Sequence, residues 1–367
     1  MAESKNSNSK VAQFVRMNTG DESFPEQGTN YFERFVQFDN YFNSNIHPHV
    51  NQGATAREPT WLTDHGPEHI TTVIRRASDL VCPNDCKLNP YEAYLLLVAA
   101  HLHDVGNVFG RSEHEKKCKD ILFDLDSTLV GANNFEKRMM CDIAMAHGGY
   151  VSASTKDQDT ISNLRYDTPR PGDKKSVRVK MLAAILRFAD ELADEHTRTS
   201  RFVMDNVNVV HPGSEIFHQY AERLRSVTID VLSGDIYINF ELNPDIVSKK
   251  YQKHNGSRYL IDEIMDRTLK MHREHVYCSR FMLPYILIER INVHIDVCSH
   301  KYSQVLGKIH YTMAQKGYPG SPKGLIEICP ELTGLTGNIL EGRVQKLVEQ
   351  ADSASSYDEP SNLLNES

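Results

Sequence analysis

The chain has 367 residues, of which 40% are hydrophobic, enough for two or three domains of about 150 residues each. Its 41 lysine and arginine residues are outnumbered by 49 aspartate and glutamate residues. The resulting net charge of −8 disfavours nucleic acid as a partner, although a local basic groove would still allow it. No apolar run in the sequence approaches the length of about 20 residues that a helix needs to cross a bilayer, and the N-terminus has no signal-peptide pattern. The cysteines are scattered, which favours reduced thiols. Together these features predict a cytoplasmic protein without membrane contact.

The composition divides the chain into four segments. Residues 1–30 are polar and rich in Ser, Asn and Gly, and residues 351–367 are acidic and rich in Ser. Because neither end offers enough apolar surface to offset the entropy of ordering, we predict a loosely ordered N-terminal segment and a disordered acidic tail. Between them we expect a helical domain over residues 31–200 and a smaller α+β module over residues 201–350.

Five helices are predicted in the first domain. The pattern over residues 69–80 places one apolar stripe on an amphipathic helix, and the next helix opens at Pro90 and is apolar on every face. Such a helix is expected in the centre of a bundle. Three further helices are expected near residues 114–122, 135–144 and 177–192. The predicted fold class is therefore mainly α, a helical bundle followed by a smaller α+β module.

A polar segment of about 25 residues, 150–175, lies between the fourth and fifth predicted helices and carries five basic side chains. Loops longer than about 15 residues are usually functional or disordered. Two interpretations remain open, a basic lid over a polyanionic substrate and a solvated insert.

The pattern changes to alternation in the C-terminal module. Residues 227–231 and 236–242 alternate around Ser233-Gly234, which predicts a β-hairpin. A helix through residues 259–275 and a strand at residues 291–297 follow. The hairpin needs a third strand for stability, for which residues 202–210 are the candidate. We expect the module to be structural or to form a homo-oligomer, and a sensor is the less favoured alternative.

Histidines and aspartates fall at positions where helices would turn them toward one another. His65 and His69 share a helix face, and His103-Asp104 end the apolar second helix, where a carboxylate and an imidazole are costly without compensation. Three more such residues lie at helix ends or in apolar patterns: His114, His147 and Asp190. A divalent cation is the simplest compensation. Imidazole with carboxylate suits Mn, Fe, Ni, Co or Zn, and Mg suits the carboxylates.

Two other interpretations concern the same residue types. The histidines could be core residues satisfied by hydrogen bonds alone. Cys82 and Cys86 could begin a zinc site, but no second pair follows at a suitable spacing, so a turn is favoured.

The order His, then His-Asp, then Asp across a helical bundle resembles the HD superfamily of metal-dependent phosphohydrolases. The motifs are His69-Ile70-Thr71-Thr72-Val73 and Leu102-His103-Asp104-Val105-Gly106. The positions of His114 and His147 are similar to those that complete a second metal site in the bimetallic branch, which includes cyclic nucleotide phosphodiesterases. The layout also resembles the HD-CE type domains of bacterial conflict systems, which implies a role in antiviral defence.

The resemblance implies a site with two divalent metal ions. His69, His103 and Asp190 would complete one ion's site, His114 and His147 would complete the other, and Asp104 would bridge both. His65, four residues before His69, would be the general acid. The lysine that usually follows the glycine of the second motif is Asn107 here, so contact with the substrate phosphate is assigned to Asn107 or Arg111.

The predicted function is a metal-dependent phosphohydrolase or phosphodiesterase that cleaves a nucleotide or cyclic nucleotide with metal-activated water. The GYP motif is absent after His147, which weighs against hydrolysis of cyclic dinucleotides. Two alternatives remain, a single-strand nuclease and a nucleotide-responsive regulatory module without catalysis.

Overall fold

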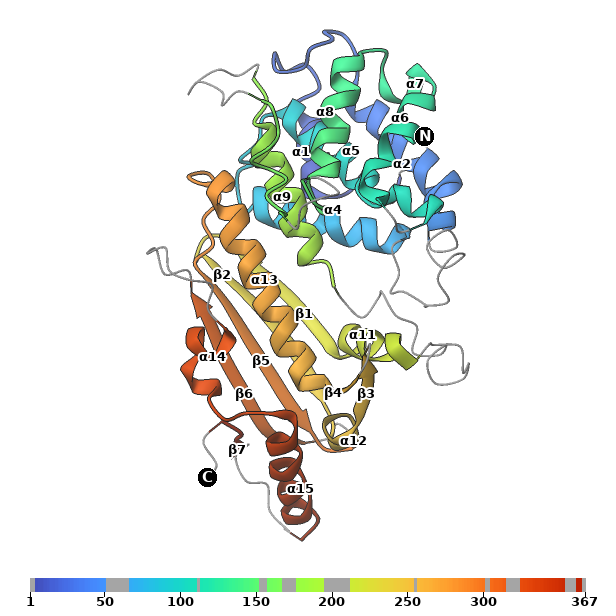
Figure 1. Cartoon of the computed structure of the whole chain (residues 1–367). Coiled ribbons are helices and arrows are strands. Elements are labelled where there is room, and N and C mark those ends of the chain that lie inside the picture. Colours follow the sequence, from blue (N-terminus) through green and yellow to red (C-terminus); the bar gives the residue numbers. More distant parts are fainter. Residues whose placement is uncertain are drawn as a thin grey trace. The chain divides into compact units, whose positions relative to one another are not determined.

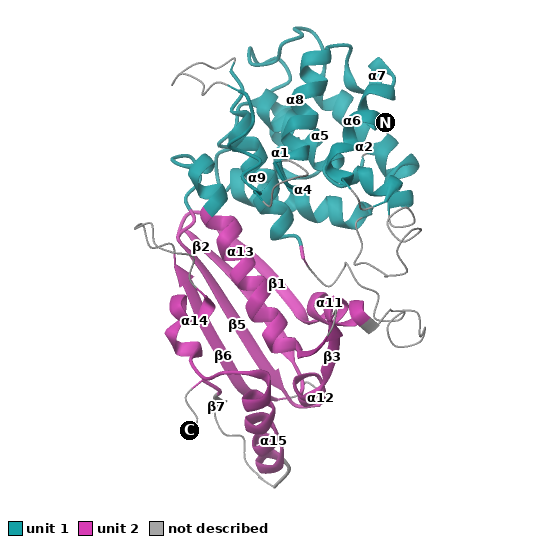
Figure 2. Ribbon diagram, in the orientation of Figure 1, with its two compact units in different colours: residues 1–193, 277–287 teal, residues 194–276, 288–367 magenta. Residues whose placement is uncertain are grey.

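A computed structural model describes most of the chain as two compact units (Figure 2). The described residues are 4–50, 66–110, 113–151, 157–166, 176–194, 212–253, 256–300, 304–314, 324–353 and 361–364. Unit 1 comprises Met1–Ala193 and Tyr277–Leu287, and unit 2 comprises Asp194–Val276 and Ile288–Ser367. Unit 1 is helical and unit 2 combines helices with a sheet, which confirms the predicted fold class (Figure 1). Among the described residues, every helix is too short or too polar to span a membrane.

The helices of unit 1 include those predicted from the periodic pattern. They are α1 (Lys10–Met17), α2 (Tyr31–Asn45), α4 (Pro67–Val81), α5 (Pro90–Leu102), η1 (Val105–Phe109), η2 (His114–Lys116), α6 (Cys118–Asp124), α7 (Ser127–Val130), α8 (Asn134–Met145) and α9 (Val179–Glu191). The five predicted helices correspond to α4, α5, α6, α8 and α9.

Helix α5 is the central element of unit 1. It contacts α1, α2, α4, α8 and α9, and every one of its residues is buried. Its start is fixed by Pro90 in the first turn and by a capping box in which the Asn89 and Glu92 side chains bind each other's backbone N–H. The buried Glu92 carboxylate also accepts hydrogen bonds of 2.8 Å from the backbone N–H and Nε of Arg178. The apolar sequence of α5 buries its C-terminal end as well, where Leu102 and the following His103 are fully buried.

The prediction of a loosely ordered segment over residues 1–30 is wrong for its described part. Helix α1 buries Val11, Ala12 and Val15, and Ser9 caps it by accepting a hydrogen bond from the Ala12 N–H. Before it, the Asn6 amide donates to the buried Asp39 carboxylate at 2.8 Å. The average composition of residues 1–30 did not indicate this helix, because a few apolar residues on one helix face are enough to bury it.

The described part of the predicted loop 150–175 is held against unit 1. Residues 157–166 bury Ile161, and the Arg187 guanidinium donates to the Gln158 carbonyl and the Thr160 hydroxyl, both at 3.1 Å. The Tyr166 hydroxyl donates to Asp142 at 2.9 Å. These residues are therefore not a freely solvated insert. Residues 152–156 and 167–175 lie outside the described part of the chain.

Unit 2 contains a mixed five-stranded sheet in the order β1-β2-β5-β6-β7. Its elements are α11 (Pro212–Arg223), β1 (Leu224–Asp230), β2 (Asp235–Leu242), α12 (Pro244–Ser248), β3 (Lys250–Lys253), β4 (Gly256–Tyr259), α13 (Leu260–Met282), β5 (Arg290–Cys298), β6 (Val305–Ala314), α14 (Leu325–Ile328), η4 (Pro330–Leu332), α15 (Gly337–Ser353) and β7 (Ser361–Asn362). Strands β1 and β2 form the predicted antiparallel hairpin, whose turn ends at Gly234 with φ of 74°. Strand β2 pairs in parallel with β5, and β5 pairs antiparallel with β6.

Two predictions about unit 2 need comment. In the described part of the sheet the third strand beside the hairpin is β5, whereas the candidate segment 202–210 lies outside the described residues. The prediction of a disordered tail over residues 351–367 is wrong where the chain is described, because α15 extends to Ser353 and β7 pairs with β6. Leu363 is fully buried and packs against Gly307, where an added Cβ would lie only 2.7 Å from Leu363 Cγ.

The predicted domain boundary at residue 200 also differs from the structure. The first segment of unit 1 ends at Ala193, and a second segment, Tyr277–Leu287, also belongs to unit 1. This second segment includes the last turns of α13. Within unit 1 the Tyr277 hydroxyl donates to Asp159 at 2.8 Å and accepts from the Ile161 N–H at 3.0 Å. Contacts so distant in sequence leave no periodic signal, so sequence reasoning missed this return.

Candidate metal centre

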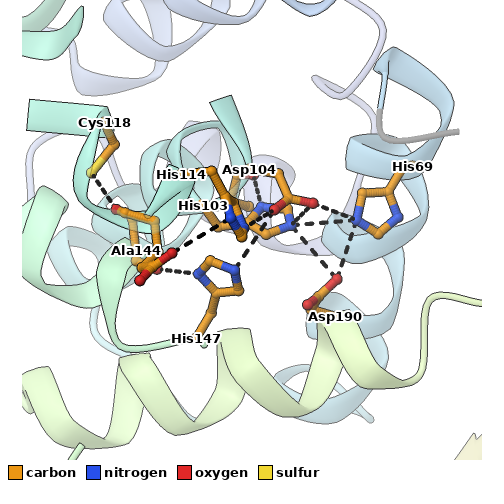
Figure 3. A network of polar contacts seen from close by, with 10 residues as sticks. His69, His103, Asp104, His114, Cys118, Ala144, His147 and Asp190 are labelled. Carbon is orange, nitrogen blue, oxygen red and sulfur yellow. Dashed lines mark hydrogen bonds and ion pairs between the residues drawn. The ribbon is translucent and has the colours of Figure 1, made fainter. Parts of the chain in front are cut away.

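Helix ends bring the predicted ligands together in unit 1. His69 lies in the first turn of α4, and His103 and Asp104 form the junction between α5 and η1. The other three lie at the start of η2, just after α8 and in the last turn of α9, and they are His114, His147 and Asp190. Side chains near helix ends can converge from several directions, so six residues from five segments meet in one cluster (Figure 3).

The first metal-ligating group consists of His69, His103 and Asp190. The Nε2 atom of His69 lies 3.1 Å from Asp190 Oδ1 and 3.3 Å from His103 Nε2. His103 Nε2 lies 3.6 Å from the same Asp190 oxygen. Both histidines are fully buried, so these ring nitrogens and the carboxylate form a compact set of three potential ligands.

The second group consists of Asp104, His114 and His147. Asp104 Oδ1 lies 3.2 Å from His114 Nε2 and 3.7 Å from His147 Nε2. The other carboxylate oxygen, Asp104 Oδ2, faces the first group, 3.5 Å from His103 Nε2 and 3.7 Å from His69 Nε2. Asp104 therefore presents one oxygen to each group, which is the geometry of a bridging ligand (Figure 3).

The outer ring nitrogens of three histidines are held by acceptors. His103 Nδ1 lies 2.8 Å from the Ala100 carbonyl, and His147 Nδ1 lies 2.6 Å from the Ala144 carbonyl. His114 Nδ1 lies 3.4 Å from Glu115 Oε2. The Nδ1–H groups of His103 and His147 donate to these carbonyls, and His114 Nδ1 faces the Glu115 carboxylate. The Nε2 atoms therefore turn their lone pairs inward, toward carboxylate oxygens that also carry lone pairs. Such an arrangement is unfavourable unless a cation lies between them, and the donor set therefore fits divalent metal ions.

The pKa values in the protein without metal reflect the same crowding. Burial would lower the pKa of His103, but the carboxylates of Asp104 and Asp190 raise it to about 9. Burial would raise the pKa of Asp190, but hydrogen bonds with His103 and His69 hold it well below its usual range. Burial and the neighbouring His103 lower the pKa of His147. The cluster thus binds a proton at His103 when no cation is present, and a cation would replace that proton.

The cluster is accessible from solvent at two of its residues. The side chain of Asp190 is 28% exposed and that of His114 is 18% exposed, whereas Asp104 is 9% exposed. A ligand can therefore approach the cluster from the side of Asp190 and His114.

Three of the predicted site residues are not among the described side chains of this cluster. His65 and Arg111 lie outside the described residues, so their roles stay predictions. Asn107 is in η1 but is only 1% exposed, and its amide has no hydrogen-bond partner in the described part of the chain. The structure does not bring the Asn107 amide to the surface, and its contact with substrate also stays a prediction.

Glu115 is a residue of the site that sequence reasoning missed. Its carboxylate oxygen Oε2 lies 3.4 Å from His114 Nδ1, and a Cβ on Gly149 would lie 2.5 Å from Glu115 Oε1. Gly149, two residues after His147, has φ of 74°. The Gly148-Gly149 pair in the sequence indicates that the backbone approaches a neighbouring residue closely, but it does not indicate that this neighbour is Glu115.

The alternative of a zinc site at Cys82 and Cys86 finds no support in the structure. Both metal-ligating groups found in the described residues consist of histidine and aspartate. The Lys87 N–H donates to the Val81 carbonyl at 2.8 Å, which closes the turn that was favoured for this segment.

Gly106 controls the position of His114, which gives a first prediction. A Cβ at residue 106 would lie 1.9 Å from the His114 carbonyl oxygen and 2.8 Å from Lys117 Cβ. Gly106→Ala should therefore displace η2 and reduce the tightly bound metal from about two ions per chain to about one. Elemental analysis after dialysis measures this. Gly148→Ala is the matched control, because a Cβ there meets nothing within 4 Å. Full metal content in Gly106→Ala would contradict the prediction.

Comparison with protein families gives a match that covers more than half of the chain and extends from unit 1 into unit 2. The protein-family model described as HD-CE matches residues 59–270, which include all six residues of the two metal-ligating groups. The curated proteins searched contain no match to this chain.

Proposed function

Because the chain belongs to the HD-CE family, we propose that it is a divalent-metal-dependent phosphohydrolase that cleaves a phosphate ester of a nucleotide or cyclic nucleotide with water. The observation that carries this proposal is Asp104, whose two oxygens face two separate groups of metal-ligating side chains. Hydrolases that use two metals hold the ions about 4 Å apart, and a shared carboxylate is a common bridge at that spacing.

The residues of the cluster divide between two ions. His69, His103 and Asp190 would hold one, His114 and His147 would hold the other, and Asp104 would bind both. When bound, the ions supply a polarised phosphate group and a water of lowered pKa.

The chain's own side chains prepare the site. Asp104 and Asp190 are fixed negative charges in a buried cluster, where they attract cations more strongly than exposed carboxylates do. The carbonyls of Ala100 and Ala144 and the nearby Glu115 carboxylate keep three imidazoles oriented with their Nε2 lone pairs inward. We assign protonation of the leaving oxygen to His65, because an imidazole has a pKa near the working pH. We assign phosphate binding to Arg111, since the family's lysine is replaced by Asn107.

Small nucleotides are favoured over long polyanions by the charge of the chain. A net charge of −8 repels a substrate that presents many phosphates, whereas a nucleotide needs only the metal centre and a few side chains.

A metal-depletion experiment tests this function. The purified protein is stripped with a chelator, reloaded with Mn²⁺ or another divalent ion, and assayed for phosphate release from nucleotides, cyclic nucleotides and single-stranded oligonucleotides. We expect about two tightly held ions per chain and turnover that returns only with metal. Hydrolysis of nucleotides should depend weakly on salt, whereas binding along an oligonucleotide would weaken steeply.

The outcomes separate the alternatives. Turnover confined to oligonucleotides, with a steep salt dependence, would replace the nucleotide substrate by single-stranded nucleic acid. Nucleotide binding without turnover under any metal would indicate a regulatory module. A metal content near zero after reloading would show that the histidines are satisfied by hydrogen bonds alone.

A further inference from the structure

The Thr160 hydroxyl links the backbone beside His147 to the helix that carries Asp190. It accepts a hydrogen bond from Arg187 Nη1 at 3.1 Å and donates one to the Ala146 carbonyl at 2.9 Å. Arg187 is on α9, three residues or about one turn before Asp190 of the first metal-ligating group. Ala146 directly precedes His147 of the second group. A hydroxyl has one donor and two acceptor positions, so a single oxygen connects the two groups.

The peptide group between Ala146 and His147 is held on both sides. Its carbonyl accepts from Thr160, and its N–H donates to the Ala144 carbonyl at 3.3 Å. The Ala144 carbonyl also lies 2.6 Å from His147 Nδ1 (Figure 3). Because a peptide group is planar, a hydrogen bond to its carbonyl also fixes the direction in which the chain enters His147. The Thr160 hydroxyl therefore acts on the orientation of this imidazole through the backbone.

Thr160 is itself fixed by its surroundings. The buried Arg187 guanidinium lies over the Tyr277 ring, 4.6 Å from its centroid. The Tyr277 hydroxyl donates to Asp159 at 2.8 Å and accepts from the Ile161 N–H at 3.0 Å. The residues on both sides of Thr160 are thus bound to one tyrosine, and the hydroxyl has a defined position whether or not an ion is bound.

We propose that Thr160 is a positioning residue of the metal centre, whose hydroxyl holds His147 where it can bind the second ion, the one assigned to Asp104, His114 and His147. This inference rests on the proposed two-metal centre. His147 follows the end of α8, where the helix no longer fixes the backbone, whereas Asp190 lies within α9. Loss of the hydroxyl should therefore weaken the second ion and spare the first. Hydrogen bonds that orient a ligand from outside typically change metal affinity by about 10- to 100-fold.

Titration of the metal-free, full-length chain with Mn²⁺ tests this role, with free Mn²⁺ measured by electron paramagnetic resonance. Thr160→Val keeps the shape of the side chain and removes the hydroxyl. It should bind the first ion as the parent does and the second about 10 to 100 times more weakly. Thr160→Ser keeps the hydroxyl and should bind both ions with the parent affinity. Unchanged affinity for the first ion also shows that the variant is folded.

Tyr166→Phe is the matched control. It removes another hydroxyl that attaches the segment 157–166 to unit 1, the one that donates to Asp142 at 2.9 Å. This hydrogen bond does not involve the peptide that precedes His147, so both ions should bind as in the parent. If Thr160→Val only loosened the segment, Tyr166→Phe would weaken the second ion to the same extent.

A second pair of variants shows whether the hydroxyl acts through His147. His147→Ala removes the ligand itself and should leave about one tightly bound ion per chain. Adding Thr160→Val to this variant should change the affinity for the remaining ion by less than about twofold, because the residue on which the hydroxyl acts is already absent. A purely structural role would weaken the remaining ion as well.

Four results would overturn the role of Thr160. They are equal affinity for the second ion in the parent and Thr160→Val, failure of Thr160→Ser to retain it, equal weakening in Tyr166→Phe, and a weakened remaining ion in the double variant. Each of these leaves the two-metal centre of the parent intact. A parent that binds fewer than two ions would instead overturn both the two-metal centre and this inference, so the two failures are distinguishable.

Discussion

Replacing Asp104 by alanine is expected to abolish hydrolysis and to reduce tightly bound metal from about two ions per chain to nearly none. Its two oxygens face the two groups separately, so no other residue of the cluster can replace it. Each cation of the proposed centre would stabilise the transition state by several kcal/mol, so a loss of about 10³-fold or more in kcat is expected. Elemental analysis and phosphate release measure the two effects on the same sample.

A matched aspartate separates loss of the site from loss of the fold. Asp79 lies on α4, the helix that carries His69, and its carboxylate forms a surface ion pair with Lys10 at 3.0 Å. Asp79→Asn should keep full metal and activity, because exposed ion pairs contribute little to stability. Asp104→Asn keeps the size of the side chain and removes its charge. If Asp104→Asn or Asp104→Ala hydrolyses substrate at nearly the parent rate, the proposed chemistry is wrong.

The helices that carry the site could be predicted because their signals are local. Helices α4 and α5 were predicted from the spacing of their apolar residues, from Pro90 and from the motif residues, all of which lie close together in the sequence. The structure has both helices where they were expected. The order of the motif residues, combined with the family resemblance, predicted six side chains that the structure brings together in one cluster. Local pattern and motif order were sufficient for this part.

What the sequence could not predict depends on contacts distant along the chain. Helix α1 buries only a few apolar residues and looked like a polar tail, and Leu363 is buried only because Gly307 leaves space for it. Residues Tyr277–Leu287 return to unit 1 through contacts with residues more than a hundred positions away. Composition averaged over a segment reports none of these contacts.

Finer features of the candidate metal centre could not be predicted from the sequence either. Side-chain orientation at η1 and η2 decides that Asp104 faces both groups and that Glu115 lies beside His114. Glu115 directly follows His114, and its position in the sequence forms no motif that would assign it to the site. Burial of Asn107 likewise depends on how η1 packs, so replacement of a family lysine by asparagine could not show where that side chain would point.

His65 carries the second large expected effect. If it donates a proton to the leaving oxygen and does not bind metal, His65→Ala should retain both tightly held ions while kcat falls by about 10² to 10⁴. Metal content and kcat are measured on the same preparation. His49→Ala is the control, because His49 is an exposed histidine at a helical position of unit 1 away from the motif, and it should keep full activity.

The leaving group decides whether the loss in His65→Ala reflects proton donation. A nitrophenolate leaves without protonation, so the variant should cleave a nitrophenyl phosphate ester almost as fast as the parent does. A nucleoside alkoxide is a poor leaving group and needs the proton, so the full loss should appear with nucleotide substrates. Equal losses on both substrates, or a fall in metal content, would instead assign His65 to metal binding or to the start of α4, since only a proton donor makes the loss depend on the basicity of the departing oxygen.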